Sequence, residues 1–322
     1  MRKRFQHAFE LTSDLQRRFQ VHLCRRRNGT GQQPIMSPTA IVKLLRPRQW
    51  VKNIFVFAPM FFSPGLTGQG ALFNVTIMFA AFCLVASGLY CLNDFCDREA
   101  DKLHPKKRNR PVASGDVSGV LAIALFVILC GAGLFVAISW TAGGWVLVAY
   151  LALTVLYSFY FKELAIIDVL TIAIGFVLRV YAGAIAAGVQ PTVWILVCTG
   201  MLALFIALTK RRDDLAQELS SDHRESLGGY SIAFLDASFV MVSTALVVSY
   251  VVFTTDADAM HRLGSENLYL TIPFVVGGTL RQLQLTIVHR RSGSPTELAT
   301  SDPGLLVSFL GWLATFAFLI YG

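Results

Sequence analysis

Long apolar runs, repeated along most of the chain, are the feature that most limits how this protein can fold. One of them extends from Ala71 to Leu92 without a charged side chain. A helix of about 20 apolar residues crosses the core of a bilayer. We count nine such runs, near residues 41–62, 71–92, 118–138, 144–161, 165–187, 191–209, 236–255, 268–289 and 304–321. The sequence therefore predicts an all-α, polytopic membrane protein with nine transmembrane helices.

Composition supports one membrane domain instead of two soluble ones. The 322 residues are 54% hydrophobic and only 15% charged, with a mean hydropathy of +0.56, which is too apolar for an ordinary soluble domain. We expect a membrane domain over residues 38–322, preceded by a basic arm over residues 1–37 that is partly disordered or interfacial. The net charge of +8 does not indicate nucleic-acid binding, because the basic residues cluster at the ends of apolar runs.

The basic residues also predict an orientation. Lys and Arg are concentrated in alternate loops, at residues 98–110, at Lys162, at residues 210–224 and at residues 290–291, while the opposite loops contain only Arg262. Cytoplasmic loops carry this excess of positive charge. The N-terminus and all the charged loops are therefore expected in the cytoplasm.

Three oxygen-bearing side chains follow the second apolar run at helical spacing. If the helix continues past Leu92, Asn93, Asp97 and Asp101 recur every four residues and share one face. Such a stripe suits Mg²⁺, which keeps several waters and shares the phosphates of a substrate. The alternative without a functional role is that Asp97 forms an ordinary surface salt bridge with Arg98 or Lys102.

Basic side chains on the same side of the membrane are candidate phosphate ligands. Arg179 lies inside the fifth apolar run, where a charge is costly and usually functional. Tyr157 and Lys162 lie where a substrate from the cytoplasm would arrive, and Lys210 and Arg211 begin the second charged loop. Each has a structural alternative, such as a positive-inside signal or a polar partner on another helix. The six cysteines show no disulfide or metal spacing.

The acidic motif resembles that of the UbiA-type intramembrane prenyltransferases. Asn93-Asp94-x-x-Asp97-x-x-x-Asp101 matches the first Asp-rich motif of that family, and the expected nine spans also fit. The resemblance implies a helical bundle with a cytoplasm-facing cavity that holds Mg²⁺ and a diphosphate. The second motif departs from the family, because Lys210-Arg211-Arg212-Asp213-Asp214-x-x-x-Glu218 stands where most members repeat Asp-x-x-x-Asp.

A narrower branch, the polyprenyl-phosphate phosphoribosyltransferases, looks closer still. The segments that carry this likeness are Arg46-Pro47-x-Gln49-Trp50-Val51-Lys52-Asn53, His104-Pro105-x-Lys107-Arg108-x-Arg110-Pro111, Tyr157-Ser158-x-x-x-Lys162, Leu178-Arg179-x-x-Ala182-Gly183 and Ser294-Pro295-Thr296-Glu297. The likeness implies transfer of 5-phosphoribose from phosphoribosyl pyrophosphate (PRPP) to a polyprenyl phosphate. The products would be pyrophosphate and polyprenyl-phosphoryl-5-phosphoribose, a precursor of arabinose donors.

The resemblance also implies roles for particular residues. The metal ligands would be Asn93, Asp94, Asp97 and Asp101. Catalytic roles would fall to Asp97, Asp101, Lys162 and Arg179. The substrate-binding residues would be Lys52, Asn53, Lys107, Arg108, Arg110, Tyr157, Lys210, Arg211, Glu218 and Arg224.

Two other functions fit parts of the pattern. A UbiA-type enzyme that prenylates an aromatic ring would use the same first motif, and a lipid or small-molecule transporter would also bury charges in a polytopic bundle. The favoured hypothesis implies a multi-pass protein of a bacterial plasma membrane with Mg²⁺, PRPP and a polyprenyl phosphate as its ligands. Nothing in the sequence indicates an oligomeric state.

Overall fold

The computed structural model describes residues 37–63, 69–103, 107–216, 228–289, 298 and 301–322, and every regular element in these ranges is helical. They belong to one compact unit, residues 36–322. The basic arm expected over residues 1–37 lies outside the described residues except at its last position, as do Glu218, Arg224 and residues 294–297.

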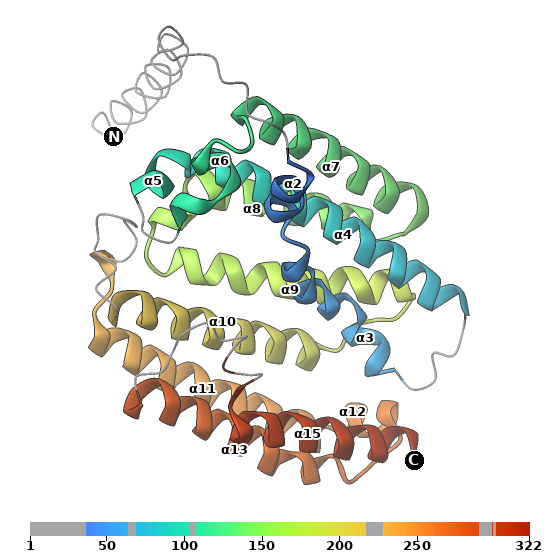
Figure 1. Cartoon of the computed structure of the whole chain (residues 1–322). Helices are drawn as coiled ribbons and strands as arrows, with labels where there is room; N and C mark the ends of the chain where they lie inside the picture. The colour runs from blue at the N-terminus through green and yellow to red at the C-terminus, as the bar shows by residue number, and fades with distance from the viewer. Residues whose placement is uncertain (1–36, 64–68, 104–106, 217–227, 290–297, 299–300) are drawn as a thin grey trace, which may run out of the picture. The chain divides into compact units, whose positions relative to one another are not determined.

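Long helices make up most of this unit (Figure 1). They are α4 (Gln69–Cys96), α7 (Gly119–Trp140), α8 (Gly144–Phe159), α9 (Ile167–Ala187), α10 (Val193–Ala216), α11 (Ile232–Thr255), α13 (Ile272–Leu283) and α15 (Pro303–Tyr321). Six helices of the described part are long and apolar enough to cross a membrane, and α8 is a shorter apolar helix. The prediction of an all-α polytopic membrane protein is confirmed.

Shorter elements connect these helices. They are α2 (Pro38–Leu45), η1 (Pro47–Phe57), α3 (Ala58–Phe61), α5 (Arg98–Leu103), η2 (Lys107–Asn109), α6 (Pro111–Ser114), η3 (Phe161–Glu163), α12 (Ala257–Leu263), η6 (Leu268–Thr271) and η7 (Gln284–Val288). Side-chain caps fix several helix starts, since Ser118, Ser231, Asp256 and Asp302 each accept a hydrogen bond from a backbone N–H three residues later.

Two of the nine expected spans are not single regular helices. The first, near residues 41–62, is divided into α2, η1 and α3, because Arg46 takes a left-handed conformation (φ 51°) and Pro47 cannot continue the α2 hydrogen bonds. The eighth, near residues 268–289, is divided into η6, α13 and the π-helical η7. Irregular backbone inside a membrane domain is tolerated where protein surrounds it.

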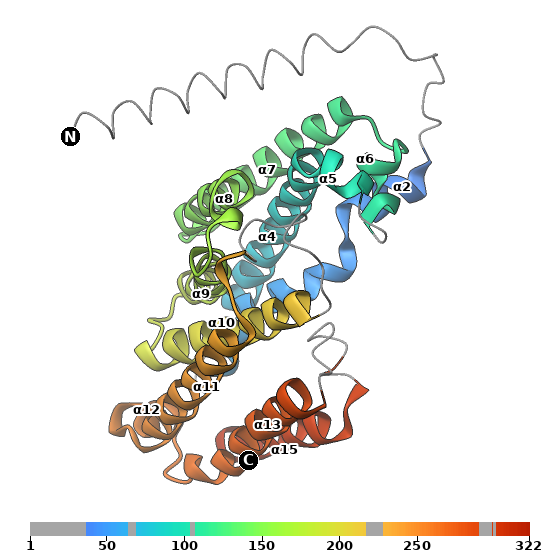
Figure 2. The same cartoon turned by 90° about the vertical axis from the view of Figure 1, so that its left-hand side faces the viewer.

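Neighbouring helices follow one another through the bundle. α7 packs on α4, α9 lies against both α4 and α8, α10 separates α9 from α11, and α13 pairs with α15 (Figures 1 and 2). Aromatic side chains join the last helix to the first segment, because Phe61 of α3 stacks on Phe316 of α15 and its carbonyl accepts the Tyr321 hydroxyl. The two ends of the membrane domain are thereby linked.

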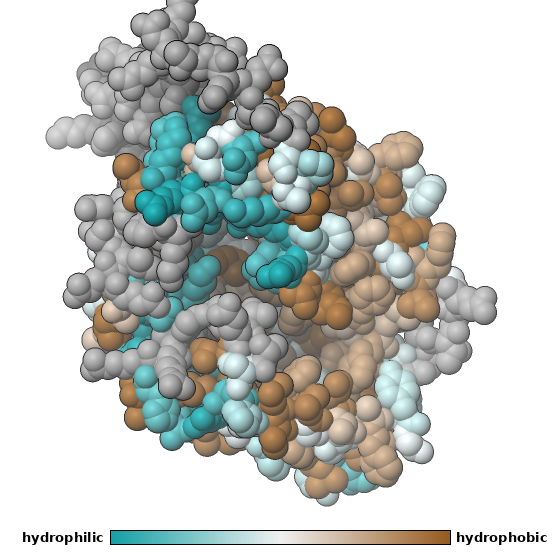
Figure 3. All heavy atoms as spheres, viewed as in Figure 1, coloured by the Kyte–Doolittle hydropathy of each residue, from teal (hydrophilic) through white to brown (hydrophobic). Residues whose placement is uncertain are grey.

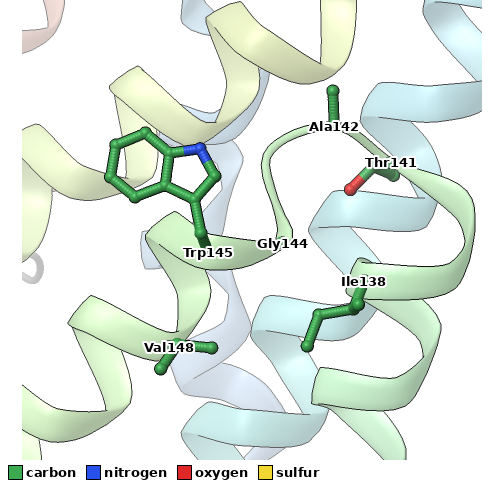
Figure 4. Close-up of a pocket in the computed structure, with 6 residues that line it drawn as sticks. All are labelled: Ile138, Thr141, Ala142, Gly144, Trp145 and Val148. Atoms are coloured by element: carbon green, nitrogen blue, oxygen red, sulfur yellow. The ribbon is translucent and has the colours of Figure 1, made fainter.

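A pocket of about 330 Å³ lies at the turn between α7 and α8 (Figure 4). Ile138, Ala142, Trp145 and Val148 give it a mainly apolar lining. It is at the start of α8, whereas Lys162 follows the end of α8, so the two are separated by the length of that helix, about 24 Å. This pocket is not part of the polar site described below.

Candidate active site

The acidic stripe has the register that its spacing predicts. The Asp97 N–H donates to the Asn93 carbonyl at 2.9 Å, and the Asp101 N–H donates to the Asp97 carbonyl at 2.8 Å. Helical hydrogen bonding thus runs from the end of α4 into α5. The Asn93 amide also donates to Asp97 Oδ2 at 2.9 Å, which brings two of the expected metal ligands into contact.

Two arginines from other segments hold the remaining acids. Arg46 Nη2 lies 2.5 Å from Asp94 Oδ1, and Arg110 Nη1 lies 2.7 Å from Asp101 Oδ2 and 3.5 Å from Asp94 Oδ1. Asp94 is 1% exposed, and Arg46 also lies over the Tyr90 ring. Arg110 therefore joins two acids of the motif.

Asp94, one of the expected metal ligands, faces the guanidinium groups of Arg46 and Arg110. Its Oδ1 is taken by Arg46, and its buried Oδ2 has no hydrogen-bond partner in the described part of the chain. The left-handed backbone at Arg46 aims that guanidinium at Asp94, so the break between α2 and η1 and the acidic motif support each other.

Lys162 reaches Asp97 from the turn between α8 and α9. Its Nζ lies 2.5 Å from Asp97 Oδ1, and both side chains are about one-quarter exposed or less. The turn between α8 and α9 therefore contacts the acidic motif directly. Lys162 and Asn93 together occupy both oxygens of Asp97.

Arg179 lies inside the bundle and is bound by neutral groups. Its guanidinium donates to Asn53 Oδ1 (2.9 Å), the Tyr150 hydroxyl (2.7 Å) and the Gly175 carbonyl (2.8 Å), and its Cζ lies 4.6 Å from the centre of the Tyr150 ring. Among the described residues no carboxylate pairs with this 7%-exposed arginine. Neutral acceptors and aromatic rings therefore surround its guanidinium in the described part of the chain.

A close contact between η1 and α9 at Gly183 allows Asn53 to form its hydrogen bond with Arg179. A Cβ atom at Gly183 would lie 1.9 Å from the Val56 carbonyl oxygen, so only glycine lets η1 approach α9 this closely. Lys52 precedes Asn53 on η1 and is within electrostatic reach of Arg179, Lys210 and Arg46. Lys52 and Arg179 are called the cationic half of the site below.

Arg211, one of the expected substrate-binding residues, is buried and paired with two carboxylates. Its side chain is 2% exposed, its Nε lies 2.5 Å from Asp168 Oδ2, and its Nη1 lies 3.2 Å from Asp214 Oδ2. Asp168 also accepts the Tyr230 hydroxyl at 2.6 Å. Burial, together with that hydrogen bond, raises the pKa of Tyr230, which therefore remains a neutral donor.

The other expected substrate ligands lie around this centre. Lys107 and Tyr157 are half-buried, at η2 and in the last turn of α8, whereas Arg108 and Lys210 are exposed. Hydrophilic side chains gather over α2, α5 and α6 on the face shown in Figure 3, next to a largely hydrophobic surface over α7. Glu218 and Arg224 lie outside the described residues.

Asn93, Asp97 and Asp101, called the acid half of the site below, fit Mg²⁺ only as a site completed by substrate. In the described ranges no three His, Cys, Asp or Glu side chains converge on a common point. The Asn93 amide nitrogen donates to Asp97 Oδ2 at 2.9 Å, so the Asn93 side-chain oxygen and the Asp97 carboxylate lie close together one turn from Asp101, and they would serve as hard oxygen ligands once Mg²⁺ replaced these hydrogen bonds. Mg²⁺ is commonly held by one or two carboxylates plus substrate phosphates and waters, and this donor set agrees with that pattern.

Several residues that shape the site lack an obvious signal in the sequence. Nothing in the sequence around Tyr150 and Tyr230 marks them, because their roles depend on hydrogen bonds to residues of another helix. Arg46 carries a weak signal, an Arg-Pro pair before an interfacial Trp50. Asp168 carries a stronger one, since an acid at the start of a membrane helix requires a partner.

Comparison with known proteins identifies the class to which this arrangement belongs. Residues 54–309 match the UbiA prenyltransferase family, and the chain belongs to that family. A structure of a UbiA homolog from Archaeoglobus fulgidus bound to DMAPP and Mg²⁺ superposes with a TM-score of 0.68 at 19% identity, over 87% of this chain and 99% of the other. That likeness shows the fold.

Two relatives are similar over nearly their whole length. The decaprenyl-phosphate phosphoribosyltransferase of Mycolicibacterium smegmatis is 31% identical over 94% of this chain and 98% of its own. The enzyme of the same name from Corynebacterium glutamicum is 33% identical over 91% of this chain and 90% of its own. The narrower resemblance noted in the sequence is therefore confirmed.

Proposed function

We propose that this protein transfers the 5-phosphoribosyl group of PRPP to a polyprenyl phosphate and releases pyrophosphate. The similarity to two decaprenyl-phosphate phosphoribosyltransferases over at least nine-tenths of the chain supports this assignment. The observation that carries it within the site is the division into an acid half and a cationic half. An enzyme of this kind must hold a pyrophosphate, a 5-phosphate and a lipid phosphate at once.

The acid half is proposed as the pyrophosphate site. Asn93 and Asp97, with Asp101 one turn further on, would hold Mg²⁺, which would neutralise the negative charge that develops on the leaving pyrophosphate. Lys162 contacts Asp97 and would exchange that carboxylate for a pyrophosphate oxygen when PRPP binds. Arg110 orients Asp101 through the 2.7 Å contact of its Nη1 with Asp101 Oδ2.

The cationic half is proposed as the site of a second anion. Arg179 has neutral hydrogen-bond partners and Lys52 lies beside it, so a phosphate would supply the charge that the described side chains do not. Arginine can bind phosphate oxygens in pairs. A second acidic motif, which most members of the family have, does not fit this arrangement of charges. Asp214, which lies in the corresponding region of this chain, is bound by Arg211.

The chemistry requires little proton transfer from the protein. An oxygen of the lipid phosphate forms a bond to C1 of ribose while the bond from C1 to the pyrophosphate oxygen breaks. The nucleophile is already anionic, so its alignment matters more than a general base. The positive charges of Lys52, Lys162 and Arg179 would bring the two anionic substrates together. They would also stabilise the negative charge that develops on the leaving pyrophosphate.

The proposal includes a location for the site. Nine spans, with η1 and α13 completing segments that enter the bilayer, would place the acid half in a cavity open to the cytoplasm of a bacterial plasma membrane. The excess of Lys and Arg on that side supports this orientation. Removal of the 5-phosphate and inversion of the configuration at C2 of the ribose, which would give an arabinose donor, would be later steps by other enzymes.

Purified protein in detergent tests the proposal. PRPP, a polyprenyl phosphate and Mg²⁺ are expected to give a phosphoribosylated lipid, and Asp97→Asn is expected to lower its rate at least about 100-fold. Asp258→Asn, the same substitution at an exposed position on α12, serves as the matched control. Full activity of Asp97→Asn, or activity that is independent of Mg²⁺, would contradict the assignment of the acid half.

A further inference from the structure

The turn that carries Lys162 contains a strained residue. Ile166 has φ 71° and ψ −49°, and it is one of only two non-glycine residues with positive φ in the described ranges. A β-branched side chain disfavours this conformation, and Ile166 is 49% exposed, so core packing does not hold it there. Strain of this kind persists only where surrounding contacts enforce it.

Tyr230 supplies the contact that enforces it. The Ile166 N–H donates to the Tyr230 hydroxyl at 2.6 Å, and that hydroxyl donates to Asp168 Oδ1, also at 2.6 Å. Asp168 is fixed in turn by Arg211, and the exposed fractions of Tyr230, Asp168 and Arg211 are 7%, 0% and 1%. A buried chain of hydrogen bonds therefore ends on the strained peptide.

Backbone hydrogen bonds connect that peptide to Lys162. The Leu164 N–H donates to the Phe161 carbonyl at 3.2 Å, and the Asp168 N–H donates to the Leu164 carbonyl at 3.0 Å. The loop before α11 also presses on the turn, because a Cβ atom at Gly229 would lie 2.5 Å from Ala165 Cβ. A shift of the Ile166 peptide would be passed to the η3 turn that directs Lys162.

We propose that Tyr230 is a positioning residue for Lys162. Its hydroxyl, oriented by Asp168, fixes the strained peptide at Ile166 and so sets the direction in which the turn presents Lys162 to Asp97. Tyr230 itself does not touch the substrate. The catalytic consequence rests on the proposed function, whereas the geometric one concerns Lys162 alone.

The first test compares two tyrosines. Tyr230→Phe is expected to lower kcat about tenfold and to leave the KM for PRPP within about twofold, because binding groups remain while the departing charge is less well stabilised. Tyr250→Phe is the matched control, since Tyr250 is also 7% exposed and its hydroxyl also makes two hydrogen bonds. Its partners are the side chains of Thr271 and Trp312, and Tyr250 lies about 30 Å further along the chain in α11. Equal losses of kcat in both variants would overturn the proposal.

The second test is rescue by glycine. Glycine adopts positive φ without strain, so Ile166→Gly removes the need for the tie to Tyr230. The double variant Ile166→Gly/Tyr230→Phe is expected to recover most of the kcat that Tyr230→Phe loses. A double variant no more active than Tyr230→Phe would show that the tyrosine acts by another route.

A third readout separates this proposal from the proposed function. The rate of Lys162 acetylation by acetic anhydride, followed by mass spectrometry without substrates, is expected to rise in Tyr230→Phe and to stay unchanged in Tyr250→Phe. This result would support the positioning role even if the wild-type protein formed no phosphoribosylated lipid, in which case the proposed function alone would fall. An unchanged Lys162 rate in Tyr230→Phe would overturn the positioning role.

Discussion

The contact between η1 and α9 allows one prediction to be worked out in detail. In Gly183→Ala the new Cβ atom would lie 1.9 Å from the Val56 carbonyl oxygen, and ordinary contact begins at 3.4 Å, so the two segments must separate by 3.4 − 1.9 = 1.5 Å. The same movement would lengthen the 2.9 Å bond between Asn53 and Arg179 to about 4.4 Å. That bond would be lost.

The magnitude follows from what is broken. A hydrogen bond to a charged group contributes about 1.5–3 kcal/mol, and overpacking of a buried contact costs about 1–3 kcal/mol. We expect Gly183→Ala to lower the free energy of unfolding by about 3 kcal/mol. We also expect it to lower kcat/KM by about 100-fold, or 2.7 kcal/mol, through misplacement of Arg179.

Thermal unfolding in detergent and the rate of lipid phosphoribosylation measure both effects. Gly131→Ala is the control, because nothing lies within 4 Å of the added methyl group and alanine favours the helix. It should keep full activity and wild-type or slightly higher stability. A Gly183→Ala variant as stable and as active as Gly131→Ala would refute the argument that η1 and α9 must touch to build the cationic half.

Three further predictions concern the acidic side chains. Asp94→Asn should change the Mg²⁺ concentration for half-maximal activity by no more than about twofold, because Asp94 binds Arg46. Asp97→Asn should raise that concentration more than about tenfold. Equal shifts in the two variants would assign Asp94 to the metal site. Asp168→Asn should lower the free energy of unfolding by about 3 kcal/mol, because it removes the main charge beside buried Arg211, and a loss below about 1 kcal/mol would speak against that pair. Hydrogen bonds from Arg281 lower the pKa of Asp302 from its ordinary value of 3.8 to about 2. The stability that these hydrogen bonds contribute is therefore present above about pH 4 and is lost as the pH falls towards 2. The difference in Tm between the wild type and Asp302→Asn should therefore narrow over that range, and a constant difference would contradict this sign.

Local spacing was enough to predict much of this structure. The apolar runs near residues 118–138 and 304–321 became α7 and α15 with ends shifted by at most two residues, because runs without charge have no competing structure in a membrane. The stripe from Asn93 to Asp101 was also predictable, since helical register depends only on neighbours in the chain. The apolar runs near residues 144–161 and 165–187 became α8 and α9, which pack against each other.

Contacts between distant segments were not predictable in the same way. Arg211 and Arg179 are both arginines in long apolar helices, yet one has a carboxylate partner and the other has neutral partners. The difference depends on which helix faces each guanidinium. Likewise, Asp94 belongs to the acidic motif by sequence but lies at the break between α2 and η1 in space, which only the position of Arg46 reveals.

The most direct measurement follows the phosphates of PRPP separately. PRPP labelled with ³²P at the 5-phosphate or at the β-phosphate of the pyrophosphate is incubated with the purified protein, Mg²⁺ and a polyprenyl phosphate. The proposed function predicts that the 5-phosphate label enters the lipid while the β-phosphate label appears in free pyrophosphate in equal amount. The proposed function would be contradicted if neither label entered the lipid and the protein instead prenylated an aromatic acceptor from a prenyl diphosphate.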